Sequence, residues 1–538
     1  TFTNASAIEL KERLMSAIYK ALETSKDVKF LKRQLNLINR ASITTIHSFC
    51  LELIRSNFYN LEIDPNFRIA DDVESKLLKS KAIQNVIEKK YQEYNEQSRD
   101  LKKDGAEINL YDILELFSGK EESLIEEILK IYNYSLSFPY PFEYLKNSIE
   151  KYNVKDLDKD LYEFDFGKQI VNDTLGDINI LKKRAELLLE EINGMEDFLK
   201  YFDVLQDDVR ILESILINSK DSWDKLYQEL NKDAFKNNPR YSGQNVELKE
   251  KLMHFRTKVL KESIKKMKLS IYATSNEILL QNASVYKYLK YLYDILSDLD
   301  VEYKSLKSKK NVIDFSDIEH LALKLLVKNI DGKYEKTEIS KSLSEEFYEV
   351  YTDEYQDTSY VQEAILNAVS KEDNRFMVGD IKQSIYKFRQ AMPEIFNNKY
   401  TSYKSAYDVS DDDKNCKIIL DKNFRSKKIV LDSINYIFEK IMSMQNGDSD
   451  YNQSETLKAG NLEYKDYENQ SYKTELNIID LEKGNETNDE FDKFIEDRKE
   501  YEIEAEAIAI KIQDLVDNFK IYDMKLGEFR KTNYRDIV

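Results

Sequence analysis

Two adjacent acids, Asp353 and Glu354, follow a short apolar and β-prone run at residues 347–351. Hydrolysis of a nucleoside triphosphate needs an anion that holds Mg²⁺ and a base that activates the attacking water. Acids at a strand end suit both tasks, because functional side chains of α/β domains gather at the carboxyl edge of the sheet. The bare pair could equally be a surface acidic turn, but Gln356 and Asp357 directly after it favour a hydrolytic site.

A second short strand, expected at residues 376–378, precedes Gly379, Asp380 and Gln383 and should deliver them to the same edge. A neutral amide such as Gln383 can report whether a γ-phosphate is present, although it could also be an ordinary exposed glutamine. A phosphate loop of the form G-x-x-x-x-G-K-[ST] does not occur in the 538 residues. The sequence therefore predicts an ATP-driven motor without its phosphate loop.

Aromatic and basic residues alternate at Tyr386, Phe388 and Arg389. Such clusters stack bases and follow the phosphates of single strands, and the alternative for each aromatic is helix core packing. Arg425 lies in the segment NFRS, residues 423–426. Its fork of donors can reach a phosphate, and the alternative is an exposed arginine at a helix start.

Small polar residues stand at two expected helix starts, in the segments that contain Phe2, Thr3 and Asn4 and, later, His47 and Ser48. Free backbone N–H groups and short polar side chains at a helix N-terminus suit contacts with phosphodiesters. Most helix N-caps share this composition, so these segments gain weight only together with the other motifs.

The composition restricts the class of protein. A length of 538 residues predicts roughly three or four domains. The net charge of −19 argues against a non-specific nucleic-acid coat but permits a narrow basic channel. With only Cys50 and Cys416 and no long apolar run, we expect a reducing, cytoplasmic location and no membrane span. The start lacks a Met and a signal segment, so we expect a fragment that begins inside a domain.

The coarse pattern predicts an α/β chain with a large helical insertion. Residues 71–300 show amphipathic helical spacing without strand alternation. Helices are expected after a cap at Thr3 or Asn4, at 49–58 and at 500–519. Strands are expected at 41–46, 347–351, 376–378, 417–420, 474–481 and 534–538.

The ordered motifs resemble those of superfamily 1 helicases of the UvrD type. They are TFTNA (1–5), TIHSFC (45–50), DFSDIE (314–319), DEYQDT (353–358), VGDIKQSIYKFR (378–389) and NFRS (423–426). The segments at 61–71 and 379–396 are similar, more specifically, to the AddA family of bacterial helicase–nuclease subunits, which are functional relatives of RecB. The resemblance covers the chain except the helical insertion, which matches mainly by position.

The resemblance implies a fold of two RecA-like motor domains of the P-loop NTPase type, with ATP bound between them. The first motor domain would comprise residues 1–70 and 301–412, the helical insertion 71–300, and the truncated second motor domain 413–538. It also implies a role for each candidate residue. Asp353 would hold Mg²⁺, Glu354 would activate water, Gln383 and Arg425 would face the γ-phosphate, and Asp380 would help to bind the nucleotide; Phe2, Thr3, Asn4, His47, Ser48, Tyr386, Phe388 and Arg389 would bind DNA.

The implied function is that of an ATP-dependent DNA helicase and exonuclease subunit that translocates on single-stranded DNA and processes double-strand breaks for recombinational repair. Its cofactors would be ATP and Mg²⁺, and its partners single- and double-stranded DNA and an AddB-like subunit. The phosphate loop, the later motor motifs and the nuclease domain are absent, so we expect this fragment to be inactive as an ATPase and nuclease. The alternatives are a UvrD-like helicase without nuclease and a degenerate DNA-binding scaffold.

Overall fold

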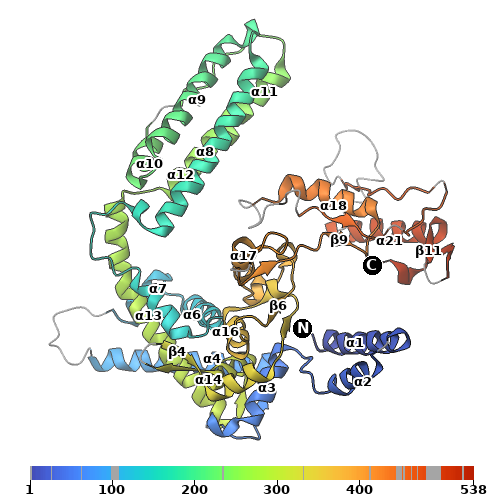
Figure 1. Cartoon of the computed structure of the whole chain (residues 1–538). Helices are drawn as coiled ribbons and strands as arrows, with labels where there is room; N and C mark the ends of the chain where they lie inside the picture. The colour runs from blue at the N-terminus through green and yellow to red at the C-terminus, as the bar shows by residue number, and fades with distance from the viewer. Residues whose placement is uncertain are drawn as a thin grey trace. The chain divides into compact units, whose positions relative to one another are not determined.

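The computed structural model describes residues 3–25, 27–61, 63–97, 108–232, 235–330, 333–410, 413–443, 451, 455–461, 463–468, 470–479, 499–523 and 526–537. The chain forms two compact units (Figure 1). The first unit comprises residues 1–350 and 359–371, and the second comprises 351–358 and 372–538. The chain therefore enters the second unit for the acidic segment, returns to the first for one helix, and leaves again.

The first unit is mainly helical. Its helices are α1 (Asn4–Thr24), α2 (Val28–Leu37), α3 (Ile46–Ser56), α4 (Asp72–Gln97), α5 (Leu110–Leu116), α6 (Glu121–Ser135), α7 (Pro141–Glu150), α8 (Asp165–Ile192), α9 (Leu199–Asn218), α10 (Trp223–Leu230), α11 (Val246–His254), α12 (Glu262–Ser270), α13 (Ser275–Lys309), α14 (Phe315–Leu326), α15 (Glu338–Glu346) and α16 (Tyr360–Val369). Its strands are β1 (Arg68–Ile69), which pairs in parallel with β2 (Val312–Ile313), and β3 (Val327–Ile330), which pairs antiparallel with β4 (Lys333–Lys336).

Helices α3, α14 and α16 share one hydrophobic core. Each buries an apolar face at helical spacing; the shared core includes Cys50, Leu53, Ile54, Ile318, Ala322, Leu323, Val361, Ile365 and Ala368. Reciprocal capping boxes begin two of the three helices, Asp314 with Asp317 at α14 and Ser359 with Gln362 at α16. These three helices form the frame on which the polar residues of the first unit are placed.

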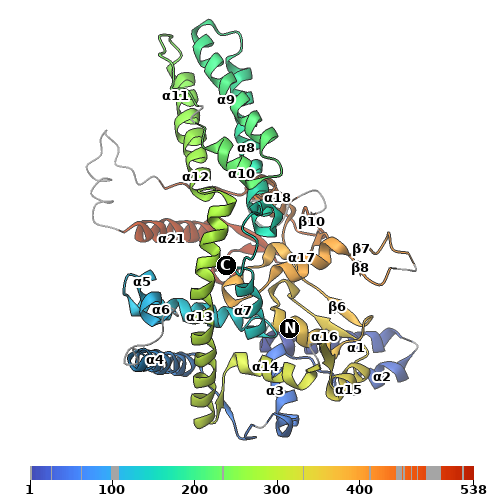
Figure 2. The same ribbon diagram turned by 90° about the vertical axis from the view of Figure 1, so that its left-hand side faces the viewer.

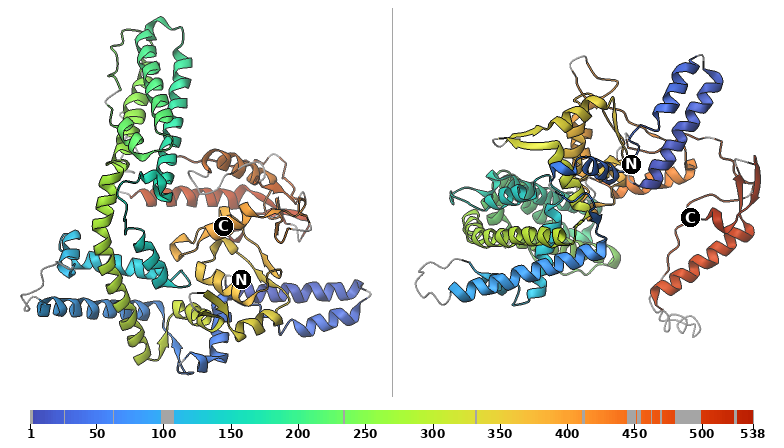
Figure 3. Two further views of the ribbon diagram at one scale, coloured as in Figure 1. Left: turned by 60° about the vertical axis from the view of Figure 1, so that its left-hand side comes forward. Right: turned by 90° about the horizontal axis from the view of Figure 1, so that it is seen from below.

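A helical arm projects from the end of the long helix α13. In Figures 2 and 3, α8 and α9 run side by side beside α11 and α12, and α13 continues from this arm as one long helix. The arm has its own core of Leu, Ile, Phe and Trp side chains, such as Leu205, Leu212 and Trp223. Described residues between 71 and 300 form helices and no strand, as the sequence predicts.

One ion pair lies fully inside the arm. Arg256, in the π-helical turn Phe255–Lys261, donates from Nε and Nη2 to the two carboxylate oxygens of Asp208, at 2.6 and 3.1 Å. Its remaining donors reach the Asn238 Oδ1 atom, at 2.6 Å, and the Lys236 carbonyl oxygen, at 2.9 Å. Both charged side chains are 0% exposed. The pair therefore joins α9 to the 236–238 segment with its hydrogen-bonding groups satisfied.

The second unit takes in all but the first residue of β5. Its elements are β5 (Val350–Thr352), β6 (Arg375–Met377), α17 (Pro393–Ser402), β7 (Lys404–Ser405), β8 (Cys416–Lys417), β9 (Lys422–Asn423), α18 (Lys428–Ile441), β10 (Lys458–Ala459), α21 (Glu500–Asn518), β11 (Lys520–Asp523) and β12 (Glu528–Lys531). β5 neighbours β6, β7 pairs in parallel with β8, β9 with β10, and β11 pairs antiparallel with β12. Within the described residues, no helix has the length and apolarity needed to cross a bilayer.

The helix predictions are confirmed more fully than the strand predictions. Thr3 caps α1, and the helices expected at 49–58 and 500–519 are α3 and α21. The strands expected near 347–351 and 376–378 are β5 and β6, and only the start of 417–420 is a strand.

Two predicted strands are wrong, and both fail through local capping. Residues 41–45 form no strand, because Thr45 serves as the N-cap of α3 and accepts a hydrogen bond from Ser48 N. The end of the chain forms a 3₁₀ turn, Tyr534–Asp536, in which Asp536 pairs with Arg530. The described part of 474–481, residues 474–479, is also irregular.

Substitution of Arg256 by Met should destabilise the arm by about 3–5 kcal/mol, because the buried Asp208 carboxylate would lose its counter-ion. Hydrogen exchange at the amides of α9 and α11 measures this change. Lys251→Met is the control: it removes an ion pair with Glu191 whose side chains are 56% and 40% exposed, and should cost less than about 1 kcal/mol. Equal effects of the two substitutions would contradict this interpretation of the arm.

Candidate active site and nucleic-acid interface

The chain segments after β5 and β6 meet at one edge. Val378 N donates to Thr352 O at 2.8 Å, and Tyr355 N donates to Val378 O at 2.9 Å. These bonds join the end of β5 to the end of β6. The acids at 353–354 and the segment from Gly379 onward are thus brought together, in the arrangement that the sequence indicated.

Glu354 has a left-handed backbone, with φ of 50° and ψ of 44°. This conformation is uncommon for a residue with a Cβ atom. It ends the strand and turns the chain into the 3₁₀ helix Tyr355–Asp357. Both Asp353 and Glu354 are exposed, so their carboxylates are accessible to a ligand.

The side chain of Gln356 connects the two segments. It is 1% exposed, and its Nε2 atom donates to Glu354 Oε2 at 2.7 Å and to Asp357 Oδ2 at 3.5 Å. Its Oε1 atom accepts from the backbone N–H of Asp380 at 3.0 Å. One buried amide therefore fixes the Glu354 carboxylate against the segment that follows β6.

Gly379 lies against this amide. A Cβ atom at position 379 would lie 3.1 Å from Tyr355 N and 2.5 Å from Gln356 Oε1, and the second distance is closer than any stable contact. The sequence motif has glycine here because the two backbones approach each other, since no φ in the left-handed region occurs at this residue.

Asp380 orders the segment after β6. Its carboxylate accepts from Gln383 Nε2 at 3.0 Å and pairs with Lys382 Nζ at 2.9 Å. Lys382 also pairs with Glu455 at 2.6 Å, and Tyr400 donates to the same Glu455 carboxylate. Gln383 and Asp380, both predicted as nucleotide-binding residues, are thus hydrogen-bonded to each other.

The electrostatics distinguish the three acids of this segment. Burial raises the pKa of the Asp357 carboxyl, and the nearby Glu354 charge raises it further. The hydroxyl of Thr352 is buried and makes no hydrogen bond with any described residue. The exposed Asp353 carboxylate fits a cation such as Mg²⁺, which keeps several waters and shares its sites with phosphates.

Arg425 lies in a turn after β9. Asn423 Oδ1 accepts from the backbone N–H groups of Arg425 and Ser426, each at 2.9 Å. The Arg425 side chain is exposed, and no hydrogen bond or ion pair among the described residues joins it to Glu354 or Gln383. Its predicted position at the γ-phosphate remains a prediction.

The two polar helix starts of the first unit lie together. Thr3 caps α1, Thr45 caps α3, and Ser48 Oγ donates to Asn4 Oδ1 at 3.4 Å. His47, with 40% of its side chain exposed, follows the α3 cap. The predicted nucleic-acid residues Thr3, Asn4, His47 and Ser48 therefore belong to two adjacent helix N-termini, while Phe2 lies outside the described residues.

The second predicted nucleic-acid cluster is exposed. The rings of Tyr386 and Phe388 have centroids 5.9 Å apart and planes tilted by 47°, and Phe388 is 77% exposed. An exposed ring can stack on a base, which core packing would prevent. The side chain of Arg389 lies outside the described part of the chain.

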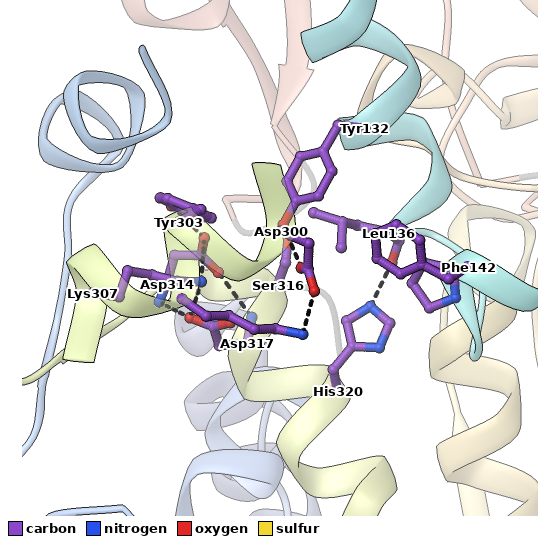
Figure 4. Close-up of a pocket in the computed structure, with 12 residues that line it drawn as sticks. Tyr132, Leu136, Phe142, Asp300, Tyr303, Lys307, Asp314, Ser316, Asp317 and His320 are labelled. Atoms are coloured by element: carbon purple, nitrogen blue, oxygen red, sulfur yellow. Dashed lines mark hydrogen bonds and ion pairs between the residues drawn. The ribbon is translucent and has the colours of Figure 1, made fainter. Parts of the chain in front are cut away.

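A polar pocket of about 130 Å³ lies elsewhere in the first unit (Figure 4). Tyr303 donates to Asp314 at 2.7 Å, Lys307 pairs with Asp317 at 2.5 Å, and Tyr132 donates to Asp300 at 2.9 Å. These bonds connect α13 and α6 to the start of α14. Because its acids already have partners, we interpret this pocket as a structural junction.

Three residues that sequence reasoning did not assign have clear roles in these contacts. Gln356 connects the acids to Asp380, Glu319 binds His47, and Glu455 pairs with Lys382. The first two lie within recognised motifs, which was a signal for them. Glu455 lies in an irregular polar stretch, and no sequence pattern distinguishes it.

Comparison with known proteins gives a consistent result. The family model for the UvrD/REP helicase N-terminal domain matches residues 1–404. The chain is 36% identical, over its whole length, to proteins named as the A subunit of an ATP-dependent helicase/nuclease from Clostridium acetobutylicum, Ruminiclostridium cellulolyticum and Clostridioides difficile. It spans 43%, 44% and 44% of those proteins, respectively. The resemblance proposed from the motifs is confirmed.

Substitution of Gly379 by Ala should destabilise the second unit by about 1–3 kcal/mol, because the new methyl group must displace the Gln356 amide. Urea denaturation with a probe in the second unit measures the loss. In Gly379→Ala/Gln356→Ala the clash with the amide is absent, so the double variant should lose less than the sum of the single losses. Additive losses would contradict this contact.

Proposed function

The chain belongs to the UvrD/REP helicase family, and from this membership we propose that the complete protein is an ATP-dependent DNA helicase and exonuclease subunit. Family membership implies a RecA-like motor fold of the P-loop type. The complete protein would translocate on single-stranded DNA and process double-strand breaks for recombinational repair. The observation that carries the proposal is the exposed acid pair Asp353–Glu354, fixed at a strand end by the buried Gln356 amide.

We assign residues 1–70 and 301–412 to the first motor domain, 71–300 to a helical insertion and 413–538 to part of the second motor domain. The continuous helical pattern between 71 and 300, and the pairing of β1 with β2 across that insertion, support the first two assignments.

For ATP hydrolysis, Asp353 would hold Mg²⁺, which supplies positive charge to the phosphates when bound. Glu354 would accept the proton of the attacking water at its carboxylate, and the hydrogen bond from Gln356 orients that carboxylate. Gln383 and Arg425 would contact the γ-phosphate, with Asp380 holding the Gln383 amide in place.

For DNA binding, the N-termini of α1 and α3 offer backbone N–H groups and the side chains of Thr3, Asn4, His47 and Ser48 to phosphates. Tyr386 and Phe388 would stack on bases, with Arg389 as a phosphate contact. Phe2 completes the set as a further proposed contact.

The 538 residues contain no G-x-x-x-x-G-K-[ST] segment. We therefore propose that ATP turnover needs residues beyond those in this chain, and that the chain alone is inactive as an ATPase and nuclease. The printed name of the relatives, which describes them as part of a helicase/nuclease, supports a nuclease activity and an AddB-like partner for the complete protein. A cytoplasmic location stays a prediction from cysteine content.

In the complete protein, Glu354→Gln should lower ATP turnover with single-stranded DNA by about 10²–10⁴-fold, because the amide cannot accept the proton of water. A coupled ATPase assay measures this. Glu338→Gln is the matched control, since Glu338 is an exposed acid on α15 that pairs with Lys341, and should leave turnover unchanged. Turnover in Glu354→Gln equal to that of the unsubstituted protein would refute the assignment.

A further inference from the structure

We propose that Glu319 is a positioning residue that couples single-stranded DNA binding at His47 to ATP hydrolysis through the start of α16. The proposal rests on the proposed function, since it assigns a role to a residue outside both candidate sites. It is carried by contacts within the first unit alone.

One oxygen of Glu319 receives two side chains. The Oε1 atom lies 3.2 Å from His47 Nε2 and accepts from Gln362 Nε2 at 2.7 Å. His47 belongs to the first turn of α3, and Gln362 to the first turn of α16. The carboxylate therefore joins the N-terminal ends of two helices that are distant in sequence.

The carboxylate is almost inaccessible to water. Glu319 is 8% exposed, whereas 40% of the His47 side chain is exposed. A buried carboxylate is costly unless donors satisfy it, so His47 and Gln362 are held firmly at Oε1. The ring of Phe315 also meets His47 edge-on, with centroids 5.8 Å apart. His47 is thus fixed on its inner side and open on its outer side.

Gln362 passes this contact to the acidic segment. Its Oε1 atom accepts from Ser359 N at 3.4 Å, while its own backbone N–H donates to Ser359 Oγ at 3.3 Å. Ser359 follows directly after the segment 353–358, which carries Glu354. A change at Glu319 Oε1 therefore alters the cap of the helix into which the acidic segment runs.

The shared core makes such a change directional. Because α3, α14 and α16 pack into one core, the three helices resist independent movement. The polar link at their N-terminal ends can then respond to a phosphate at His47 and shift Gln362. A purely structural carboxylate would stabilise the unit without affecting how DNA changes turnover.

The test uses the complete protein and poly(dT) as the DNA, with ATP turnover measured with and without it. Glu319→Gln keeps the shape and an acceptor oxygen but removes the charge. We expect the ratio of DNA-stimulated to basal turnover to fall about tenfold. The Kd for poly(dT) should change less than about threefold, because the other helix N-terminal contacts remain. Glu338→Gln, exposed on α15, should keep the ratio.

A second variant, Gln362→Met, breaks the same link from its other side and keeps the proposal testable if Glu319→Gln does not fold. The double variant should fall no further than either single variant, since both interrupt one path. An unchanged ratio in Glu319→Gln or Gln362→Met, or losses that multiply in the double variant, overturns the coupling role. Absence of DNA stimulation in the unsubstituted protein would instead refute the proposed function.

Discussion

The second unit depends on one buried amide. Gln356 donates to Glu354 and accepts from Asp380 N, so it fixes both segments that carry the candidate hydrolytic residues. An amide can do this because it offers a donor and an acceptor in one plane, whereas a carboxylate would repel Glu354. The close approach explains the glycine at 379 and places Asp380 where it can hold Gln383 and Lys382.

The first unit meets a related requirement with buried carboxylates. Asp314 and Asp317 cap α14 and receive Tyr303 and Lys307 from α13, while Glu319 in the next turn receives His47 and Gln362. α14 thus has apolar contacts on one face and ionic contacts near its start. In the arm, the Arg256–Asp208 pair serves the same purpose in isolation. Polar groups in these helices are specific because each buried charge has a geometrically defined partner.

Much of the site could be predicted from the sequence, since acids after a β-prone run, caps such as Thr3 and aromatic residues between basic ones are local patterns. The helical insertion was equally readable from its periodicity. The strands at 41–46 and 534–538 were not, because Thr45 and Asp536 form caps and ion pairs that override β propensity. The partners of Gln356, Glu319 and Glu455 come from distant segments, so no local pattern could identify them.

The central claim is that Gln356 holds Glu354 ready for hydrolysis. Single-turnover ATP hydrolysis by the complete protein carrying Gln356→Ala, with nucleotide affinity measured in parallel, tests this claim most directly. We expect the hydrolysis rate to fall at least about 100-fold while the affinity changes less than about threefold. Hydrolysis at the rate of the unsubstituted protein would contradict the claim, because Glu354 would then need no partner.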